Sequence, residues 1–372
     1  MTASDGLGRP VLLGRRPILV TGGAGFIGSN LADRLAREGH DVLVYDALAR
    51  PGVESNLVWL KSHHPQRISS VVADIRDERG VADAARDAEA VFHFAAQVAV
   101  TTSLVTPRED FDINVQGTLH LLEALRKRNR LVPLLFASTN KVYGDLGDVQ
   151  LEETNDAYVP RDPAIRARGI GEDRPLDFHT PYGCSKGAAD QYVLDYARSF
   201  GVPTAVMRMS CIYGPRQMGT EDQGWVAHFL IRALEGEPIS IYGDGRQVRD
   251  VLNVADAVEA YLSAWRRIDA VQGRAFNLGG GPANAVSLRQ LLRHVEDLIG
   301  RPVDLAFSDW RAGDQRYYIS DTSRAACELE LRPPIPWRTG VAALARWLAD
   351  ERGLKGQATR AAARPQAAEA LP

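Results

Sequence analysis

The sequence predicts an α/β protein built on a doubly wound parallel sheet, with a smaller α/β region toward the C-terminus. Short apolar runs such as residues 18–20 (ILV) end in glycine or polar residues, as buried parallel strands do. Stretches with helical periodicity, such as residues 26–38, separate these runs. This alternation continues from residue 17 to about residue 207 and is typical of a parallel sheet covered on both faces.

The order of elements predicts where the chain divides. After the first strand and helix, strands are expected at residues 42–45, 70–73, 90–94, 134–137 and 204–207, and helices around residues 119–125 and 182–200. The pattern is then less regular, with an amphipathic helix at residues 225–234 and sheet-like runs at residues 251–253 and 275–278. Further helices are expected within residues 286–350, with a strand near Val303. We therefore expect a disordered leader at residues 1–15 and a first domain at residues 16–215, which also receives residues 247–280. Residues 216–246 and 281–350 are expected to form a substrate-binding domain, and residues 351–372 a disordered tail.

The bulk composition excludes several classes of protein. The formal net charge of −3 over 372 residues gives no drive toward nucleic acid or an anionic membrane. We find no signal peptide and no apolar run near the roughly 18 residues that a membrane span needs. Three cysteines, Cys184, Cys211 and Cys327, lack metal-ligand spacing. They predict a protein of the reducing cytoplasm with no metal site.

A glycine motif follows the first expected strand and opens the first expected helix. Gly22 permits a tight turn, Gly25 lets the backbone approach a pyrophosphate, and Gly28 allows the helix to pack closely on the strand. Phe26 and Ile27 complete the turn, and the helix N-terminus faces the phosphate charge. Because a glycine match alone is weak, its position between strand and helix is what predicts a Rossmann-type dinucleotide site.

Acidic residues after the second and third strands predict which dinucleotide binds. Asp46 ends the second strand, where a carboxylate accepts hydrogen bonds from the adenosine ribose and repels a 2′-phosphate. Arg50 is the counter-evidence, because a nearby arginine can hold that phosphate. Asp74 and Ile75 follow the third strand and can contact the adenine, although Asp74 can equally serve only to end the strand. The sequence thus favours NAD over NADP.

Tyr182 and Lys186 lie four residues apart in an expected helix and so share one face. A nearby ammonium and a nicotinamide ring both favour the phenolate, and we expect them to lower the pKa of Tyr182. Tyr182 can then take a proton from a sugar hydroxyl as hydride leaves the carbon. Thr139, at the end of the strand at 134–137, can steady the substrate oxygen. Alone, each residue is more often structural, and their order after the glycine motif is what favours catalysis.

Taken together, these residues resemble the extended short-chain dehydrogenase/reductase family over about residues 17–350. The positions that match the family's cofactor and catalytic residues are residues 21–28, Asp46, Asp74, Phe94, Ala95, Ala96, Asn114, Thr139, Tyr182 and Lys186. The resemblance implies tightly held NAD and a nucleotide-sugar substrate for an epimerase or dehydratase. It also implies a homodimer or homotetramer through helices around residues 110–128 and 181–200.

A narrower resemblance, to 2-epimerases of CDP-linked dideoxysugars, is carried by residues 138–144, 176–192, 222–226 and 245–251. Asn140 and Lys141 stand where nucleotide-sugar 4-epimerases usually have small residues. The resemblance implies inversion of CDP-paratose to CDP-tyvelose at C2 through a 2-keto intermediate, with Asn140 and Lys141 holding the C2 oxygen or orienting the ring. Arg249 and Arg311 fall where the family clamps the substrate pyrophosphate. Arg216 is a further candidate, although a surface salt bridge is the likelier reading for it.

Three alternatives stay open on the sequence alone. One is a 4-epimerase or 4,6-dehydratase acting on a UDP-, dTDP- or GDP-sugar, although Asn140 and Lys141 occupy the places of the acid pair that dehydratases use. Another is a non-catalytic NAD sensor, which the presence of Tyr182 and Lys186 disfavours. The third concerns residues 145–178, a polar insertion that can form either a lid over the sugar or only a surface excursion.

Overall fold

The computed structural model describes residues 16–220, 222–311 and 313–354. The predicted leader and the tail from residue 355 onward lie outside the described residues. The expected tail begins inside the last helix, which ends at Glu351, and the backbone N–H of Leu354 donates to the Ala349 oxygen at 2.7 Å.

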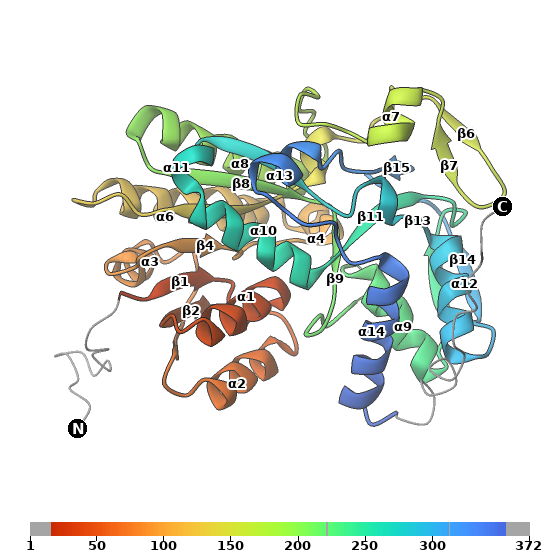
Figure 1. The fold of residues 1–372 in the computed structure, drawn as a ribbon, viewed down its shortest axis with the longest axis horizontal. Coiled ribbons are helices and arrows are strands. Elements are labelled where there is room, and N and C mark those ends of the chain that lie inside the picture. Colours follow the sequence, from red (N-terminus) through yellow and green to blue (C-terminus); the bar gives the residue numbers. More distant parts are fainter. Residues whose placement is uncertain (1–15, 221, 312, 355–372) are drawn as a thin grey trace.

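A seven-stranded parallel sheet forms the centre of the larger region (Figure 1). Its spatial order is β12 (Arg274–Leu278), β8 (Thr204–Met209), β5 (Leu134–Thr139), β4 (Val91–His93), β1 (Ile18–Thr21), β2 (Val42–Asp46) and β3 (Ile68–Val72). The strand order reverses between β1 and β4, so the chain leaves the centre of the sheet in both directions. The predicted doubly wound parallel sheet is confirmed.

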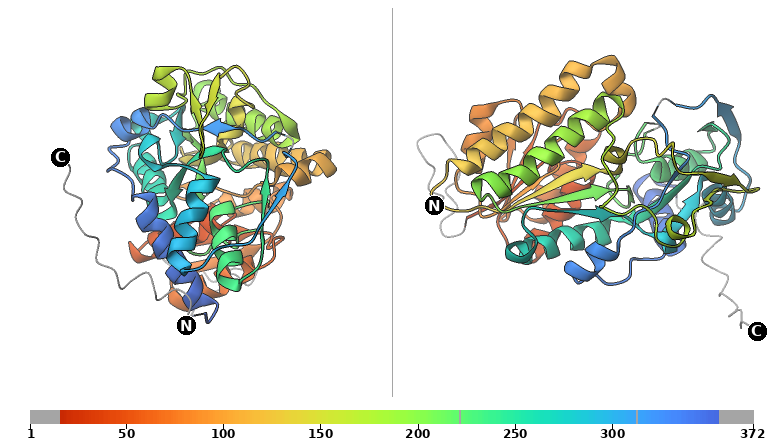
Figure 2. Two further views of the ribbon diagram at one scale, coloured as in Figure 1. Left: turned by 90° about the vertical axis from the view of Figure 1, so that its right-hand side faces the viewer. Right: turned by 90° about the horizontal axis from the view of Figure 1, so that it is seen from above.

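Helices cover both faces of this sheet, as the edge-on view in Figure 2 shows. One face packs through residues such as Val20 and Val44 on α1 (Phe26–Arg37), α2 (Val53–His63), α10 (Val254–Arg266) and α11 (Ile268–Val271). The other packs through residues such as Leu19 and Phe136 on α3 (Glu78–Ala85), α6 (Gly117–Arg126) and α8 (Thr180–Phe200). Alternate residues of each strand therefore face opposite layers, and burial on both faces explains the continuous apolar runs.

The second region has its own core beside the carboxyl ends of the large sheet (Figure 1). Its helices are α9 (Trp225–Glu235), α12 (Leu288–Ile299) and α14 (Trp337–Glu351). A four-stranded sheet joins β9 (Cys211–Tyr213), β11 (Val248–Asn253), β13 (Ala285–Ser287) and β15 (Tyr317–Tyr318), and β10 (Ile239–Tyr242) pairs with β14 (Leu305–Ser308). Within 247–280, the segment expected to return to the large sheet, β12 and α10 do so, whereas β11 lies in this second sheet.

Short elements complete the described part of the chain. They are α4 (Val100–Val105), α5 (Pro107–Phe111), a π-helical turn (Asp112–Gln116), 3-10 turns η2 (Asn140–Tyr143) and η3 (Pro282–Asn284), and α13 (Ser323–Glu328). Across the described ranges, we find no helix long and apolar enough to span a membrane.

The insertion at residues 145–178 contains β6 (Leu151–Glu153), β7 (Tyr158–Pro160) and α7 (Pro163–Arg168). It is bonded to both regions: the Asn277 amide nitrogen on β12 donates to the Ile170 oxygen at 2.8 Å, and the Tyr158 backbone N–H donates to the Arg246 oxygen at 3.0 Å. All of these residues are described, and none lines the large cavity discussed below. The structure therefore shows the insertion as a bridge between the two regions.

Candidate active site

A cavity of about 620 Å³ lies at the carboxyl ends of β1, β2, β4, β5 and β8, against α9 of the second region. Ligands of doubly wound sheets bind at this edge, where the strand order reverses. The lining includes Asn140 of the predicted substrate-binding set and almost every predicted residue of the cofactor and catalytic sets: Gly22, Gly25, Phe26, Ile27, Gly28, Asp46, Asp74, Ile75, Ala95, Ala96, Thr139, Tyr182 and Lys186.

The glycine loop after β1 has no room for side chains at two of its positions. Gly22 has φ 67°, and a Cβ there would lie 2.6 Å from the Ala95 nitrogen. A Cβ on Gly28 would lie 2.2 Å from the Gly22 oxygen. At Gly25 the nearest atom to an added Cβ is the Gly22 oxygen at 3.1 Å, with nothing else within 4 Å. The loop is thus packed on the strand side and open at Gly25, as a pyrophosphate cradle requires.

Asp46 holds the glycine loop as well as lining the cavity. Its carboxylate accepts from the backbone N–H of Ala24 and from that of Leu48, both at 2.9 Å. Arg50 lines the same end of the cavity. Asp74 is paired with Arg76 at 2.6 Å, and hydrogen bonds from that guanidinium lower the pKa of the carboxyl.

Asn114 lies behind the cavity and is absent from its lining. It is 1% exposed in the π-helical turn, where its amide nitrogen donates to the Ser185 hydroxyl and to the Gln97 backbone oxygen, both at 3.0 Å. Ser185 in turn donates to Asp110. Asn114 therefore fixes α8 against the loop after β4 from behind the site.

Tyr182 and Lys186 are both buried on α8 and face the end of β5. The Thr139 side chain lies close enough to the Tyr182 phenol to lower the pKa of that group. The Lys186 ammonium donates to the Ala137 backbone oxygen at 2.6 Å and lies 4.3 Å from the centre of the Phe136 ring. The helix thus places a phenol, a hydroxyl and an ammonium at one end of the cavity.

Burial dominates the pKa of both groups. It raises the pKa of Tyr182 to about 12, against the opposing effect of the Thr139 side chain. It lowers the pKa of Lys186 to about 7, although Asp190 and Asp110 oppose this change. In the protein without NAD, desolvation therefore outweighs the effect of Lys186, whose ammonium is directed at a backbone oxygen. The expected lowering of the Tyr182 pKa, which includes the charge of the nicotinamide ring, stays a prediction for the NAD-bound protein.

Other residues that support the site gave no recognisable sequence motif. The Ser103 hydroxyl accepts from the backbone N–H of Tyr182 at 3.2 Å, at the open N-terminus of α8. Beneath the site, the Asp190 carboxylate binds Arg208 through two nitrogens at 3.0 Å and accepts from Ser138 at 2.7 Å. Ser103 and Tyr182 are 79 residues apart, Asp190 and Arg208 are 18 apart, and Ser138 and Asp190 are 52 apart. Motif analysis does not detect contacts between residues separated in this way.

Asn140 and Lys141 form the turn after β5 and contact the second region. Asn140 lines the cavity, and its amide nitrogen donates to the Gln315 side-chain oxygen at 3.0 Å. The Lys141 ammonium donates to the Gly313 backbone oxygen at 2.8 Å and is absent from the cavity lining. Burial, followed by the nearby charge of Arg249, lowers its pKa to about 8.

The three predicted arginines lie in different places. Arg216 lines the cavity with its guanidinium 3.9 Å from the Trp59 ring centre, packed between the two regions. Arg249 is buried and paired with Asp314 at 2.6 Å, and neither it nor Arg311 lines the cavity. Arg311 lies over the Tyr242 ring at 3.7 Å and within 3.5 Å of the cavity-lining Asp222.

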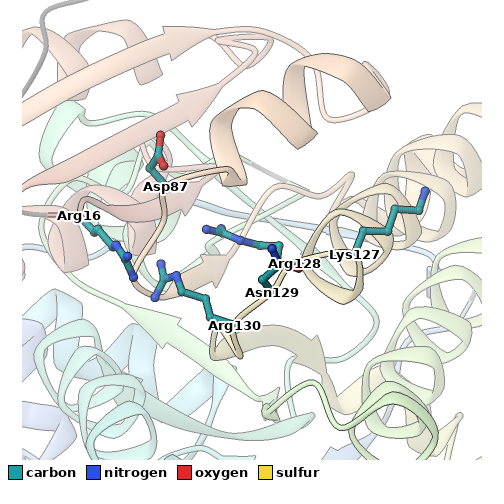
Figure 3. Close-up of a pocket in the computed structure, with 6 residues that line it drawn as sticks. All are labelled: Arg16, Asp87, Lys127, Arg128, Asn129 and Arg130. Atoms are coloured by element: carbon teal, nitrogen blue, oxygen red, sulfur yellow. The ribbon is translucent and has the colours of Figure 1, made fainter.

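A second hollow, of about 350 Å³, lies at the opposite edge of the sheet (Figure 3). Its lining residues precede β1, β4 and β5 and are Arg16, Asp87, Lys127, Arg128, Asn129 and Arg130. Arg128 and Arg130 donate to the backbone oxygens of Ala85 and Ala88. These contacts satisfy carbonyl groups after α3, which is a structural use of the two arginines.

Fold and site together define a dinucleotide-binding enzyme of the extended short-chain dehydrogenase/reductase class. Residues 18–279 match the NAD dependent epimerase/dehydratase family. CDP-paratose 2-epimerase of Salmonella typhi is 42% identical over 339 residues, which cover 89% of this chain and 98% of that protein.

Solved structures agree with this assignment. UDP-glucose 4-epimerase of Thermotoga maritima, solved with UDP-glucose, has a TM-score of 0.76 and 30% identity, and the match covers 90% of this chain and 99% of that one. UDP-glucose 4-epimerase of Thermus thermophilus, solved with NAD, has a TM-score of 0.75 and 30% identity, and the match covers 89% and 98%. The chain belongs to the NAD dependent epimerase/dehydratase family, and its cofactor is NAD.

Proposed function

We propose that this protein inverts C2 of CDP-paratose to give CDP-tyvelose. One observation carries the proposal: the Tyr182–Lys186–Thr139 group stands at the NAD end of a cavity whose adjoining turn holds Asn140 and Lys141. These two residues set the chain apart from the usual 4-epimerase pattern. The 42% identity to a CDP-paratose 2-epimerase over nearly the whole chain supports it.

The structure of the substrate restricts the route. A 3,6-dideoxyhexose has no oxygen on C3, and its C1 is bound to phosphate. Inversion at C2 therefore requires oxidation of C2 itself to a ketone, followed by reduction from the opposite face. When bound, NAD supplies the chemistry of accepting a hydride and giving it back. Net redox is zero, so the cofactor is regenerated in each cycle and need not dissociate.

The residues of the chain then have distinct roles. We propose that Tyr182 takes the C2 hydroxyl proton and returns it, with Thr139 steadying the same oxygen. Because burial alone raises the pKa of Tyr182, the positive charges of Lys186 and of the oxidised nicotinamide must offset that rise when NAD is bound. In this proposal, Lys186 also donates to the nicotinamide ribose.

The cofactor would lie along the remaining lining of the cavity. We propose that Gly22, Gly25 and the N-terminus of α1, from Phe26 to Gly28, hold the pyrophosphate, and that Asp46 accepts from the adenosine ribose. Asp74 and Ile75 would flank the adenine, Ala95 and Ala96 would line the path to the nicotinamide, and Asn114 would support that path from behind.

At the sugar-nucleotide end, Arg311 is our first candidate for the substrate pyrophosphate, because its partner Asp222 lines the cavity. Arg249 is a second candidate that must leave Asp314 to reach the phosphates. Arg216 lines the cavity and packs on Trp59, and we propose that it closes the cavity over the cofactor.

Product analysis tests the proposal. The purified protein is incubated separately with CDP-paratose and with UDP-glucose, and the products are separated and identified by NMR. Conversion of CDP-paratose to CDP-tyvelose with no change in UDP-glucose is expected. Interconversion of UDP-glucose and UDP-galactose would instead establish the alternative, a 4-epimerase.

A 4,6-dehydratase is part of the same alternative, because the chain is also similar to dTDP-glucose 4,6-dehydratases, with 34% identity to the one from Mycolicibacterium smegmatis. Against dehydration, the positions beside Thr139 carry Asn140 and Lys141, neither of which is a carboxylic acid. A non-catalytic NAD sensor is the remaining alternative, and a Tyr182→Phe protein that keeps full biological activity would favour it.

We also propose a homodimer or homotetramer built on the helix pair α6 and α8. Exposed apolar side chains lie along α8 and on the neighbouring α4 and α5: Leu104, Val105, Phe111, Tyr192 and Phe200. Such a group on a water-facing surface is typical of an interface. Light scattering on the protein as it elutes from a sizing column measures its mass in solution and so its oligomeric state. In a Tyr192→Lys variant this mass is expected to shift toward that of the monomer.

A further inference from the structure

Two asparagine side chains of the large region hold the backbone of the second region. The residues that they hold, Pro215 and Arg216, lie between β9 and α9. On α1, the Asn30 side-chain nitrogen donates to the Pro215 oxygen at 3.0 Å. On α2, the Asn56 side-chain nitrogen donates to the Arg216 oxygen at 3.3 Å. Two successive carbonyl groups of the second region are thus bound by two helices of the large region.

The same two nitrogens also bind the glycine loop and the start of α1. The Asn56 nitrogen donates to the Ala24 oxygen at 3.1 Å, and the Asn30 nitrogen donates to the Phe26 oxygen at 2.8 Å. The backbone N–H of Ala24 is bound in turn by Asp46 at 2.9 Å, so side chains fix both polar backbone groups of Ala24. Each asparagine is therefore a direct bridge between the loop and the second region.

The orientation of Asn56 shows that this bridge is what the side chain is used for. Its two acceptors are backbone oxygens, which only accept, so the amide must turn its nitrogen toward them. The residue is fully buried, and its side-chain oxygen is left without a hydrogen-bond partner in the described part of the chain. Because an unpaired buried oxygen is unfavourable, the two bonds of the nitrogen are what keep the amide in this orientation.

The backbone at Arg216 depends on such contacts. Its φ is 71°, in the left-handed region that side chains other than glycine rarely adopt. Its guanidinium lies 3.9 Å from the ring centre of Trp59 on α2 and 5.5 Å from that of Trp347 on α14. A strained conformation of this kind persists only where surrounding groups impose it, and here these groups come from both regions.

The residues that follow this point form one side of the cavity. Residues 216–220 and 222–226 all line it, and we call them the cavity wall. Helix α9 begins within the wall at Trp225 and packs into the core of the second region. Because the wall starts at the carbonyl groups that the two asparagines bind, the position of Arg216 decides where the wall lies relative to the glycine loop.

We propose that Asn30 and Asn56 are positioning residues that bridge the glycine loop and the cavity wall, so that NAD bound to the loop also holds the wall in place. The inference rests on the proposed function in one respect, that the same cavity takes a nucleotide sugar beside NAD. Since coupling between two binding sites is reciprocal, NAD and the sugar should each strengthen the binding of the other.

Hydrogen–deuterium exchange of the full-length protein, depleted of NAD and then saturated with it, tests the proposal. In the wild type, NAD is expected to slow exchange about tenfold both at the glycine loop, residues 22–28, and at residues 216–220 of the wall. Asn56→Leu keeps the size of the side chain but removes the nitrogen that forms the bridge. In this variant NAD should still protect residues 22–28, whereas its protection of residues 216–220 should fall to about twofold or less.

Asn284→Leu is the matched control. Asn284 is also buried, its side-chain nitrogen donates to the Ile335 oxygen at 2.9 Å, and it does not line the cavity. This variant should keep the wild-type pattern of protection. Protection of residues 216–220 that persists in Asn56→Leu would show that NAD acts on the wall without the bridge, and would overturn the proposal.

A second variant keeps the proposal testable if Asn56→Leu fails to fold. Asn30 is only half-buried, and Asn30→Leu removes the bond to Pro215. It should lower the protection of residues 216–220 by about threefold, and wild-type protection in this variant would contradict the proposal. Because these measurements need no sugar, inactivity toward CDP-paratose would remove the proposed function and leave the exchange result standing.

Discussion

The two ends of the cavity are built in different ways. The end proposed for the cofactor depends on residues close in sequence: Gly22 and Gly28 are six positions apart, and Asp46 supports the same loop through the Ala24 backbone. The end proposed for the sugar depends on contacts between distant segments, such as Asn140 with Gln315, 175 positions apart. The first is a local backbone shape, and the second is a junction between two regions.

The difference teaches what each end can tolerate. The glycine loop cannot accept an added atom at Gly22 or Gly28, because the neighbours there are backbone atoms that cannot move aside. A junction of side chains can lose one contact and keep its fold, but it loses the orientation that the contact imposed. We therefore expect changes at the cofactor end to act on stability and NAD binding, and changes at the sugar end to act on catalysis and selectivity.

Gly28→Ala should have the largest effect on stability. The new methyl group would lie 2.2 Å from the Gly22 oxygen, so helix α1 must shift away from the strand. We expect a loss of about 3 kcal/mol in the free energy of unfolding, together with loss of bound NAD. Urea denaturation measures the free energy of unfolding, and the absorbance of the purified protein measures the bound NAD.

Gly147→Ala is the matched control for this substitution. No atom lies within 4 Å of a Cβ at Gly147, so the change should stay within about 0.5 kcal/mol. Equal losses in the two variants would contradict the packing argument.

Lys186 makes stability depend on pH. In the NAD-free protein its folded pKa of about 7 lies below that of an unfolded lysine, so between these values the unfolded state binds more protons and stability rises with pH. Its favourable contribution is complete above the unfolded pKa and is lost as pH falls through 7. Lys186→Met removes the dependence, and the wild-type free energy of unfolding should gain about 1–2 kcal/mol relative to the variant between pH 7 and pH 9.

Denaturation of both proteins across this pH range measures the effect. Parallel curves for wild type and variant would show that Lys186 is not titrating in the folded state.

Lys141→Met tests the junction at the sugar end. It leaves the Gly313 backbone oxygen without its donor, so we expect a cost of about 1 kcal/mol in stability and a raised KM for the nucleotide sugar, with NAD binding unchanged. Isothermal calorimetry with NAD and steady-state kinetics separate the two ends of the cavity. Lys127→Met, at an exposed position on the opposite edge, is the control, and an unaltered KM in Lys141→Met would argue that the tie to Gly313 does not matter.

Arg293→Ala should have the smallest effect. Arg293 holds the insertion to α12 through two bonds to Asp156, at 2.8 and 2.7 Å, but both side chains are exposed. Exposed pairs contribute about 0.2–1 kcal/mol, so we expect a loss within this range and no change in kcat. A large fall in kcat would show that the bridge at residues 145–178 acts as a lid after all.

The sequence was sufficient to predict the sheet and to predict residues that line one cavity at its carboxyl edge, because both follow from local patterns. The glycine loop, Asp46 and the Tyr182–Lys186 spacing each lie within one strand, turn or helix. The sequence did not show that Lys141 binds Gly313 or that Arg249 pairs with Asp314, because no local pattern brings such distant segments together. It also did not show that burial raises the pKa of Tyr182 in the protein without NAD, since burial is a property of the folded molecule.

The central claim is that the sugar is oxidised and reduced at C2, and an isotope experiment tests it most directly. CDP-paratose carrying deuterium on C2 is converted by the protein in ordinary water, and the product is examined by NMR. We predict CDP-tyvelose that keeps its deuterium at C2, because the hydrogen taken from this carbon is returned to it without contact with solvent. Product with ordinary hydrogen at C2, or no CDP-tyvelose at all, would contradict the account.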